Sequence, residues 1–143
     1  MTGRAPLILG KYRNIAHRWS ACFWRRRQLT VARADNETGW AGIAPVKTTP
    51  TVPIAAATLD QICAGIESID VLKIDVEGAE SLVLKGASGL LRAQRIKEVF
   101  LEVNKVCMAR LGIANDEPLE LLHTFGYQCM SDGDGAYAVL VNR

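Results

Sequence analysis

A strand–helix–strand pattern in the middle of the chain restricts the fold most strongly. Residues 69–75 and 98–103 are short apolar runs typical of strands, and the apolar positions of residues 79–94 between them repeat with a helical period. The first run does not alternate cleanly, as expected of a strand that is covered on both faces. Strands joined through a helix form right-handed crossovers and lie parallel in one sheet. The pattern predicts a mostly parallel α/β sheet with helices on its faces.

Further elements flank this unit. Thr58 and Gln61 have the spacing of a capping box, which predicts a helix that begins at Thr58 and ends at Gly65. The remaining expected segments are a strand at 29–34, extended or loop chain at 40–52, irregular chain at 104–117, a helix from Pro118 to Gly126, and strands at 127–130 and 136–141. The last two strands flank a turn sequence and predict an antiparallel C-terminal hairpin.

Charge divides the chain into two parts. Eight Lys and Arg and no acid precede Asp35, whereas nine Lys and Arg and fifteen Asp and Glu follow from there. We therefore distinguish a basic segment, residues 1–34, from a domain at residues 35–143. The run Arg25, Arg26 and Arg27 lies beside aromatic residues, as in nucleic-acid or anionic-membrane patches. An acid-poor targeting peptide is a second interpretation. We favour a solvated segment without a function of its own, and expect no nucleic-acid partner.

The cysteines and histidines exclude several kinds of site. The four cysteines, Cys22, Cys63, Cys107 and Cys129, form no CxxC pair, which argues against a structural zinc site. Without an evident secretory signal they indicate reduced thiols and a cytoplasmic protein. No apolar run reaches the roughly 18 residues of a transmembrane segment. His123 lies on a predicted helix, where a packing role is more common than a catalytic one.

Polar residues gather where the two central strands end. Asp75 and Glu77 follow the first strand, and Glu102 and Asn104 end the second, with Lys105 beyond. Ligands of open α/β sheets bind beyond the carboxyl ends of the strands, so neighbouring strands would bring these side chains to one crevice. Alternatively, Asp75 and Glu77 cap the following helix. Glu102 interrupts an apolar run, where a buried carboxylate needs a partner.

Several sequence blocks resemble the FkbM family of methyltransferases. The blocks are Thr58-Leu59-Asp60, Lys73 to Glu80 (KIDVEGAE), Leu84 to Ala87 (LKGA), Leu101-Glu102-Val103, and a Leu-rich helix that ends in Gly126-Tyr127. The resemblance covers roughly residues 58–143. It implies a Rossmann-like class I methyltransferase sheet, of which this chain has the C-terminal portion with its hairpin. It also implies S-adenosylmethionine as the methyl donor and a hydroxyl on a small molecule or sugar as the acceptor.

The chain departs from this family where the cofactor should bind. The first strand of such a sheet runs into a glycine-rich turn, and an acid ends the second strand. The only candidate for the first strand and turn, residues 7–11 (LILGK), has one glycine, and no acid precedes Asp35. We therefore expect the cofactor-binding half to be missing or replaced by the basic segment.

Two classes of function remain. In a methyltransferase, Asp75 and Glu77 are the expected catalytic carboxylates, because a carboxylate can remove the proton of the acceptor hydroxyl. Glu102 and Asn104 would then lie next to the cofactor or the substrate. We predict no metal; the alternative is a divalent cation held by Asp75, Glu102 and Asn104. The second class is a truncated, non-catalytic fragment or an interaction module. Because a half-sheet exposes a long edge strand, we also expect a homo-oligomer.

Overall fold

The computed structural model describes residues 7–9, 21–22, 28–33, 41–43, 51–131 and 135–140, with side chains from Ala56 to Met130. Its elements in chain order are β1 (Leu7–Leu9), β2 (Ala21–Cys22), β3 (Gln28–Arg33), β4 (Ala41–Ile43), β5 (Thr51–Ala57), α1 (Leu59–Ile62), β6 (Ile69–Ile74), α2 (Glu80–Lys85), α3 (Ser88–Arg92), β7 (Ile96–Glu102), α4 (Lys105–Arg110), α5 (Glu117–Thr124), β8 (Tyr127–Ser131) and β9 (Gly135–Leu140). Residues 10–11 and Arg25 to Arg27 lie outside the described residues, so the predictions for them stay open.

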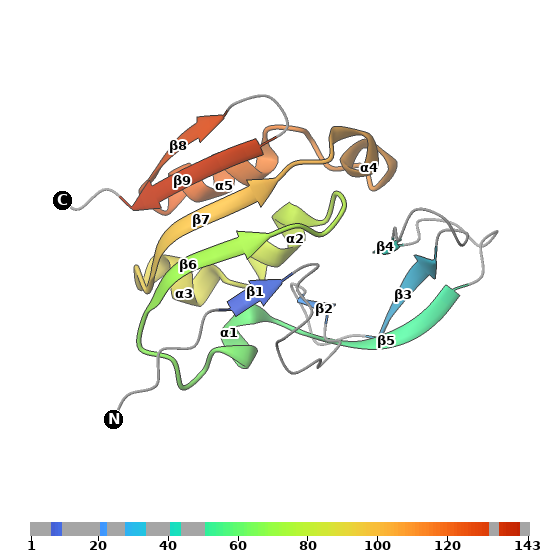
Figure 1. The fold of residues 1–143 in the computed structure, drawn as a ribbon, viewed down its shortest axis with the longest axis horizontal. Helices are drawn as coiled ribbons and strands as arrows, with labels where there is room; N and C mark the ends of the chain where they lie inside the picture. The colour runs from blue at the N-terminus through green and yellow to red at the C-terminus, as the bar shows by residue number, and fades with distance from the viewer. Residues whose placement is uncertain are drawn as a thin grey trace.

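A five-stranded sheet forms the main body, in the order β1-β6-β7-β9-β8 (Figure 1). β1, β6 and β7 run parallel, with Leu9 opposite Ile74 and Ile74 opposite Leu101. β9 is antiparallel to both β7 and β8. The predicted α/β class with parallel central strands is confirmed. We call the side of the sheet where β1, β6 and β7 end the carboxyl edge.

A smaller four-stranded sheet has the order β2-β5-β3-β4. β3 is antiparallel to β4 and β5, and β2 is parallel to β5. The strand predicted at residues 29–34 is confirmed as β3, shifted by one residue. β5 leads directly into α1 through Thr58, so along the chain the strands of the small sheet lie between β1 and the other strands of the main sheet.

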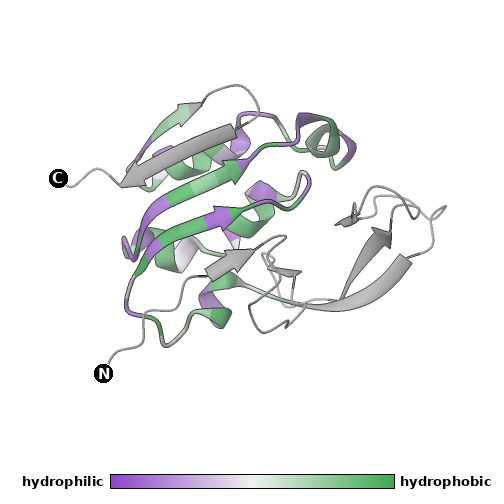
Figure 2. Ribbon diagram, viewed as in Figure 1, coloured by the Kyte–Doolittle hydropathy of each residue, from purple (hydrophilic) through white to green (hydrophobic). Residues whose placement is uncertain are grey.

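The described helices α1, α2, α3 and α5 lie on one face of the main sheet (Figure 1). Hydrophobic residues concentrate in β6, β7 and these helices (Figure 2). On the other face Val71 and Phe100 are 42% and 43% exposed. The prediction of a central strand covered on both faces is therefore wrong at Val71. The apolar residues of β6 alternate irregularly because the charged residues Asp70 and Lys73 interrupt them.

One hydrophobic core joins the helices to the sheet. Its largest fully buried side chains are Tyr127, Leu59, Leu72, Ile74, Leu84, Leu91, Ile96, Met108 and Leu122. Tyr127 of β8 donates a hydrogen bond from its hydroxyl to the carbonyl of Ile96, at 2.5 Å. Burial raises the pKa of Tyr127 to about 12, so the hydroxyl keeps its proton and remains a donor. This bond connects β8 to the first residue of β7.

The start of α1 follows the sequence prediction. Thr58 accepts a hydrogen bond from the Gln61 N–H, and the Gln61 side chain accepts one from the Thr58 N–H, so the capping box is confirmed. The helix ends at Ile62, three residues before Gly65.

The single helix predicted at residues 79–94 is wrong, because the chain forms α2 and α3 there. In a continuous helix the Leu90 N–H would donate to the Gly86 carbonyl. Here the Gly86 carbonyl accepts from the Asp60 N–H at 3.0 Å. The Asp60 carboxylate accepts from the N–H groups of Leu90 and Gly89, at 3.0 and 2.9 Å. Asp60, on α1, therefore replaces both partners of the missing helical bond: its N–H donates to the Gly86 carbonyl, and its carboxylate accepts from the Leu90 N–H and so caps α3.

We expect Asp60→Ala to destabilise the protein by about 1–2 kcal/mol, because two backbone N–H groups lose their acceptor. Urea unfolding followed by circular dichroism measures the change. Asp116→Ala is the matched control, since Asp116 precedes α5 without a capping hydrogen bond from its side chain. Equal losses of stability in the two variants would contradict the role of Asp60.

Residues 104–117, predicted to be irregular, contain the helix α4. Asn104 begins this helix, because its Oδ1 accepts a hydrogen bond from the Cys107 N–H at 3.0 Å. The prediction overlooked this N-cap. α4 lies just beyond the end of β7 and therefore borders the carboxyl edge (Figure 1).

Candidate active site at the carboxyl edge

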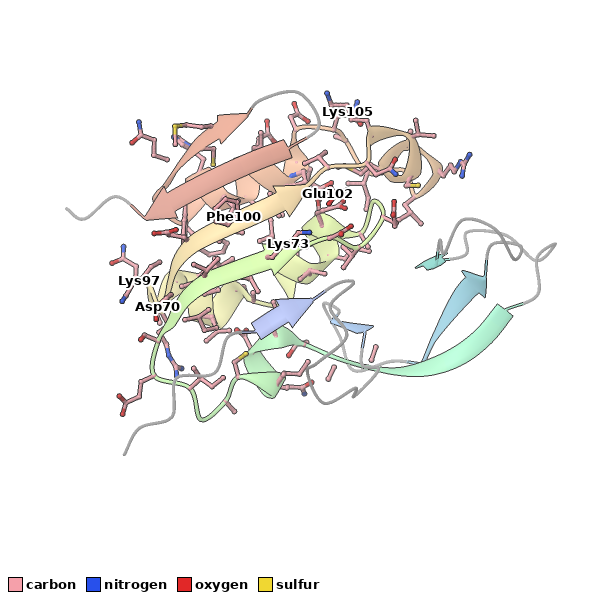
Figure 3. The ribbon with its side chains drawn as sticks, in the orientation of Figure 1. Asp70, Lys73, Lys97, Phe100, Glu102 and Lys105 are labelled. Carbon is pink, nitrogen blue, oxygen red and sulfur yellow. The ribbon has the colours of Figure 1, made fainter. Side chains whose placement is uncertain are left out.

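The side chains predicted to converge are brought together as two pairs. Asn104 donates a hydrogen bond from Nδ2 to Glu77 Oε2 at 2.8 Å, which connects the chain after β6 to the chain after β7. The second pair, Asp75 and Glu102, is joined through a third residue, because Lys73 Nζ lies 3.5 Å from Asp75 Oδ2 and 3.6 Å from Glu102 Oε2. Figure 3 shows Lys73 and Glu102 side by side, with Lys105 beyond them. Asp70 and Lys97 form an ion pair at the opposite ends of the same strands.

Lys73 is a site residue that the sequence interpretation missed. It lies opposite Phe100 in the register of β6 and β7, so Asp75 and Glu102, two residues further on, share its face of the sheet. Glu102 thus has a cationic partner, but its side chain is 63% exposed and does not need one. Exposed ion pairs contribute only about 0.2–1 kcal/mol, so the pair with Glu102 adds little to the stability of the fold.

The turn after β6 has an unusual backbone. Glu77 and Gly78 have φ angles of +52° and +94°, which a side chain disfavours. A Cβ at Gly78 would lie 2.6 Å from the backbone of Cys107 and of Met108 in α4. Glycine is therefore required both by the turn and by the close approach of α4. Capping hydrogen bonds from Asp75 and Glu77 were the alternative prediction; Ala79 precedes α2 and no side-chain hydrogen bond caps this helix, so that part is wrong.

Glu80 is a second site residue that was missed. It is completely buried, and its Oε1 accepts a hydrogen bond from the Gly78 N–H at 2.9 Å. Glu80 Oε2 and the neighbouring Ser81 Oγ are buried without a hydrogen-bond partner in the described part of the chain. Burial raises the pKa of Glu80; hydrogen bonds from the N–H groups of Gly78 and Glu80 lower it, and the nearby charges of Glu77 and Asp75 raise it.

The edge can therefore accept protons and hydrogen bonds. The side chain of Asp75 is 18% exposed, so this carboxylate is shielded but accessible.

No group of three or more His, Cys, Asp or Glu side chains between 56 and 130 is arranged to hold a metal ion. His123 is exposed on α5. Cys63, Cys107 and Cys129 are free thiols, and burial raises the pKa of each.

Comparison with known families identifies the class of protein. An α/β sheet with carboxylates at its carboxyl edge is consistent with a methyltransferase, and residues 10–129 match the methyltransferase FkbM domain. The chain therefore belongs to the FkbM methyltransferase family. The match begins N-terminal to Thr58 and includes β2 to β5. No curated protein and no solved structure matches the chain significantly. Among the described residues, no helix is long and apolar enough to cross a bilayer.

Proposed function

We propose that this chain is an S-adenosylmethionine-dependent methyltransferase that methylates a hydroxyl oxygen of a small molecule or sugar. The observation that carries the proposal is the gathering of Asp75, Glu77 and Glu102 at the carboxyl edge of a sheet in a member of the FkbM family. The family supports methyl transfer, and the carboxylates supply the acid–base chemistry that an alcohol acceptor needs.

The sheet supports a Rossmann-like cofactor site. β1, β6 and β7 are neighbouring parallel strands, so their carboxyl ends share one edge of the sheet. In open α/β sheets ligands bind in a crevice beyond the carboxyl ends of the strands. We expected the cofactor-binding half to be missing or replaced by the basic segment; the pairing of β1 with β6, which brings Leu9 beside Ile74 at the carboxyl edge, supports β1 as one of its strands.

The residues at this edge fit the chemistry of the cofactor. Its ribose hydroxyls and its ammonium group are hydrogen-bond donors, and carboxylate oxygens accept from both. Glu102 suits this role, because its carboxylate is 63% exposed. Asn104 is less suitable, since its Oδ1 accepts from Cys107 and its Nδ2 donates to Glu77. The bound cofactor supplies an electrophilic methyl carbon.

In this mechanism the protein removes the proton of the acceptor hydroxyl and holds the acceptor molecule in position. Asp75 takes the proton of the acceptor hydroxyl as general base, while the ammonium of Lys73, 3.5 Å away, orients its carboxylate. Glu77 has one oxygen bound to Asn104 and accepts a further hydrogen bond from the acceptor with the other. Alignment of the hydroxyl by fixed groups contributes to the rate independently of the base.

Calorimetric titration of the whole chain with S-adenosylmethionine, and with its demethylated product, tests the proposal. We expect both to bind, and Glu102→Gln to weaken binding roughly tenfold, because a hydrogen bond to a charged group is lost. Glu98→Gln, the same change four residues earlier on β7, is the control. No heat at millimolar ligand would instead indicate a non-catalytic fragment or an interaction module.

A further inference from the structure

We propose that Glu80 is a positioning residue that holds Glu77 at the carboxyl edge through the backbone of Gly78. The proposal rests on the proposed function, because positioning matters only if Glu77 serves that site. It is a role for a residue that contacts neither the acceptor nor the cofactor.

The first step is the bond between Glu80 and the peptide group that follows Glu77. Glu80 Oε1 accepts from the Gly78 N–H at 2.9 Å, in a buried setting. This N–H belongs to the peptide plane between Glu77 and Gly78. Glu80 thereby fixes that plane and supports the positive φ angles of both residues, +52° and +94°. Without an acceptor the buried N–H would be unsatisfied, which disfavours the turn.

The second step is the contact of the same turn with α4. Gly78 lies directly against the backbone of Cys107 and Met108. At the start of α4, Asn104 accepts from the Cys107 N–H at 3.0 Å and donates to Glu77 Oε2 at 2.8 Å. Glu77 is therefore held through its backbone by Glu80 and through its side chain by Asn104. If the turn relaxes, the distance between Glu77 and Asn104 changes.

The burial of Glu80 supports a role beyond packing. One carboxylate oxygen has a partner, while Oε2 is buried without one in the described residues, and burial of an unpaired polar atom is unfavourable. Such a cost is commonly found where a local geometry serves a site. Burial raises the pKa of Glu80, and glutamine has the same length and the same carbonyl acceptor without the charge.

The test distinguishes the length of the Glu80 side chain from its charge. Glu80→Gln keeps an acceptor at the right distance without the charge, whereas Glu80→Asp keeps the charge on a side chain one methylene shorter. The readout is the NMR signal of the Asn104 side-chain amide, assigned by its loss in Asn104→Asp. We expect this signal to stay in place in Glu80→Gln. In Glu80→Asp we expect it to shift toward its position in Glu77→Ala. Glu120→Gln, at an exposed position of α5, is the control.

Kinetics provide a second readout. We expect Glu80→Asp to lower kcat by roughly 10- to 100-fold with little change in the KM for the cofactor, and Glu80→Gln to restore turnover. The opposite order, with aspartate active and glutamine inactive, would overturn the proposal. If Glu80→Asp does not fold, the hydrogen bond itself is measured by NMR in the wild-type protein. The absence of a scalar coupling between the Gly78 nitrogen and the Glu80 carboxyl carbon would also overturn the proposal. If the wild type transfers no methyl group, the proposed function fails, while the Asn104 signal still tests Glu80.

Discussion

Replacing Gly78 with alanine is expected to destabilise the protein by about 2–5 kcal/mol and to abolish methyl transfer. A residue with a side chain in the left-handed region costs about 1–2 kcal/mol, and forcing an extra carbon into a packed site costs about 1–3 kcal/mol. Both apply here, because φ is +94° and a Cβ would lie 2.6 Å from two backbone atoms of α4. Backbone atoms cannot move aside as the end of a flexible side chain can.

Two other glycines separate these contributions. Gly112 has φ +69° and nothing within 4 Å of a Cβ, so Gly112→Ala should cost only the conformational part, about 1–2 kcal/mol. Gly65 has equally open space without a positive φ, so Gly65→Ala should change stability by less than about 0.5 kcal/mol. Urea unfolding of the three variants gives the comparison. A loss at Gly78 no larger than that at Gly112 would show that α4 does not press on the turn.

Local patterns predicted the elements whose determinants are close in sequence. The capping box of Thr58 and Gln61 needs only four consecutive residues, and the structure contains it. The strand at residues 69–75 was predicted to within one residue, because four of the six residues of β6 are apolar and two of these are β-branched isoleucines at its ends. The N-cap at Asn104 is equally local and was overlooked, although a good acceptor followed by Lys-Val-Cys-Met-Ala-Arg is a helix signal.

Interactions between distant residues could not be predicted in this way. The helical period through residues 79–94 is intact, and a glycine such as Gly86, which ends α2, is by itself also tolerated inside a helix. The break depends on Asp60, which lies 29 residues before Gly89 and supplies both its carboxylate and its N–H. The family-like block Thr58-Leu59-Asp60 therefore has a structural role in separating α2 from α3.

Part of the candidate site could be predicted from the sequence. Asp75, Glu77, Glu102 and Asn104 follow from the rule that strand ends gather at one edge. Glu80 had a signal as well, because it precedes the buried Val83 and Leu84 by three and four residues and so lies on the apolar stripe of α2. The contact of Lys73 with Asp75 is local, two residues apart on one strand face, whereas its contact with Glu102 depends on the register that sets β6 against β7.

Asp75→Asn is expected to lower kcat by about 10²–10⁴-fold, the usual effect of losing a general base. The amide keeps the shape of the carboxylate but cannot take the proton of the acceptor hydroxyl. Stability should change little, because the ion pair with Lys73 is long, at 3.5 Å, and the lysine is 39% exposed. Initial rates of methyl transfer, measured together with urea unfolding, separate the two effects.

Asp70→Asn is the matched control, because it makes the same change at the other end of β6. Asp70 pairs with Lys97 at 2.6 Å, and both side chains are at least half exposed, so its loss should change stability by about 0.2–1 kcal/mol and leave turnover intact. If Asp75→Asn keeps wild-type turnover, Asp75 is not the base. In that case Glu77→Gln decides whether the proton is taken at the other carboxylate of the turn. If only the KM of the acceptor rises, Asp75 binds the hydroxyl in the ground state as strongly as in the transition state.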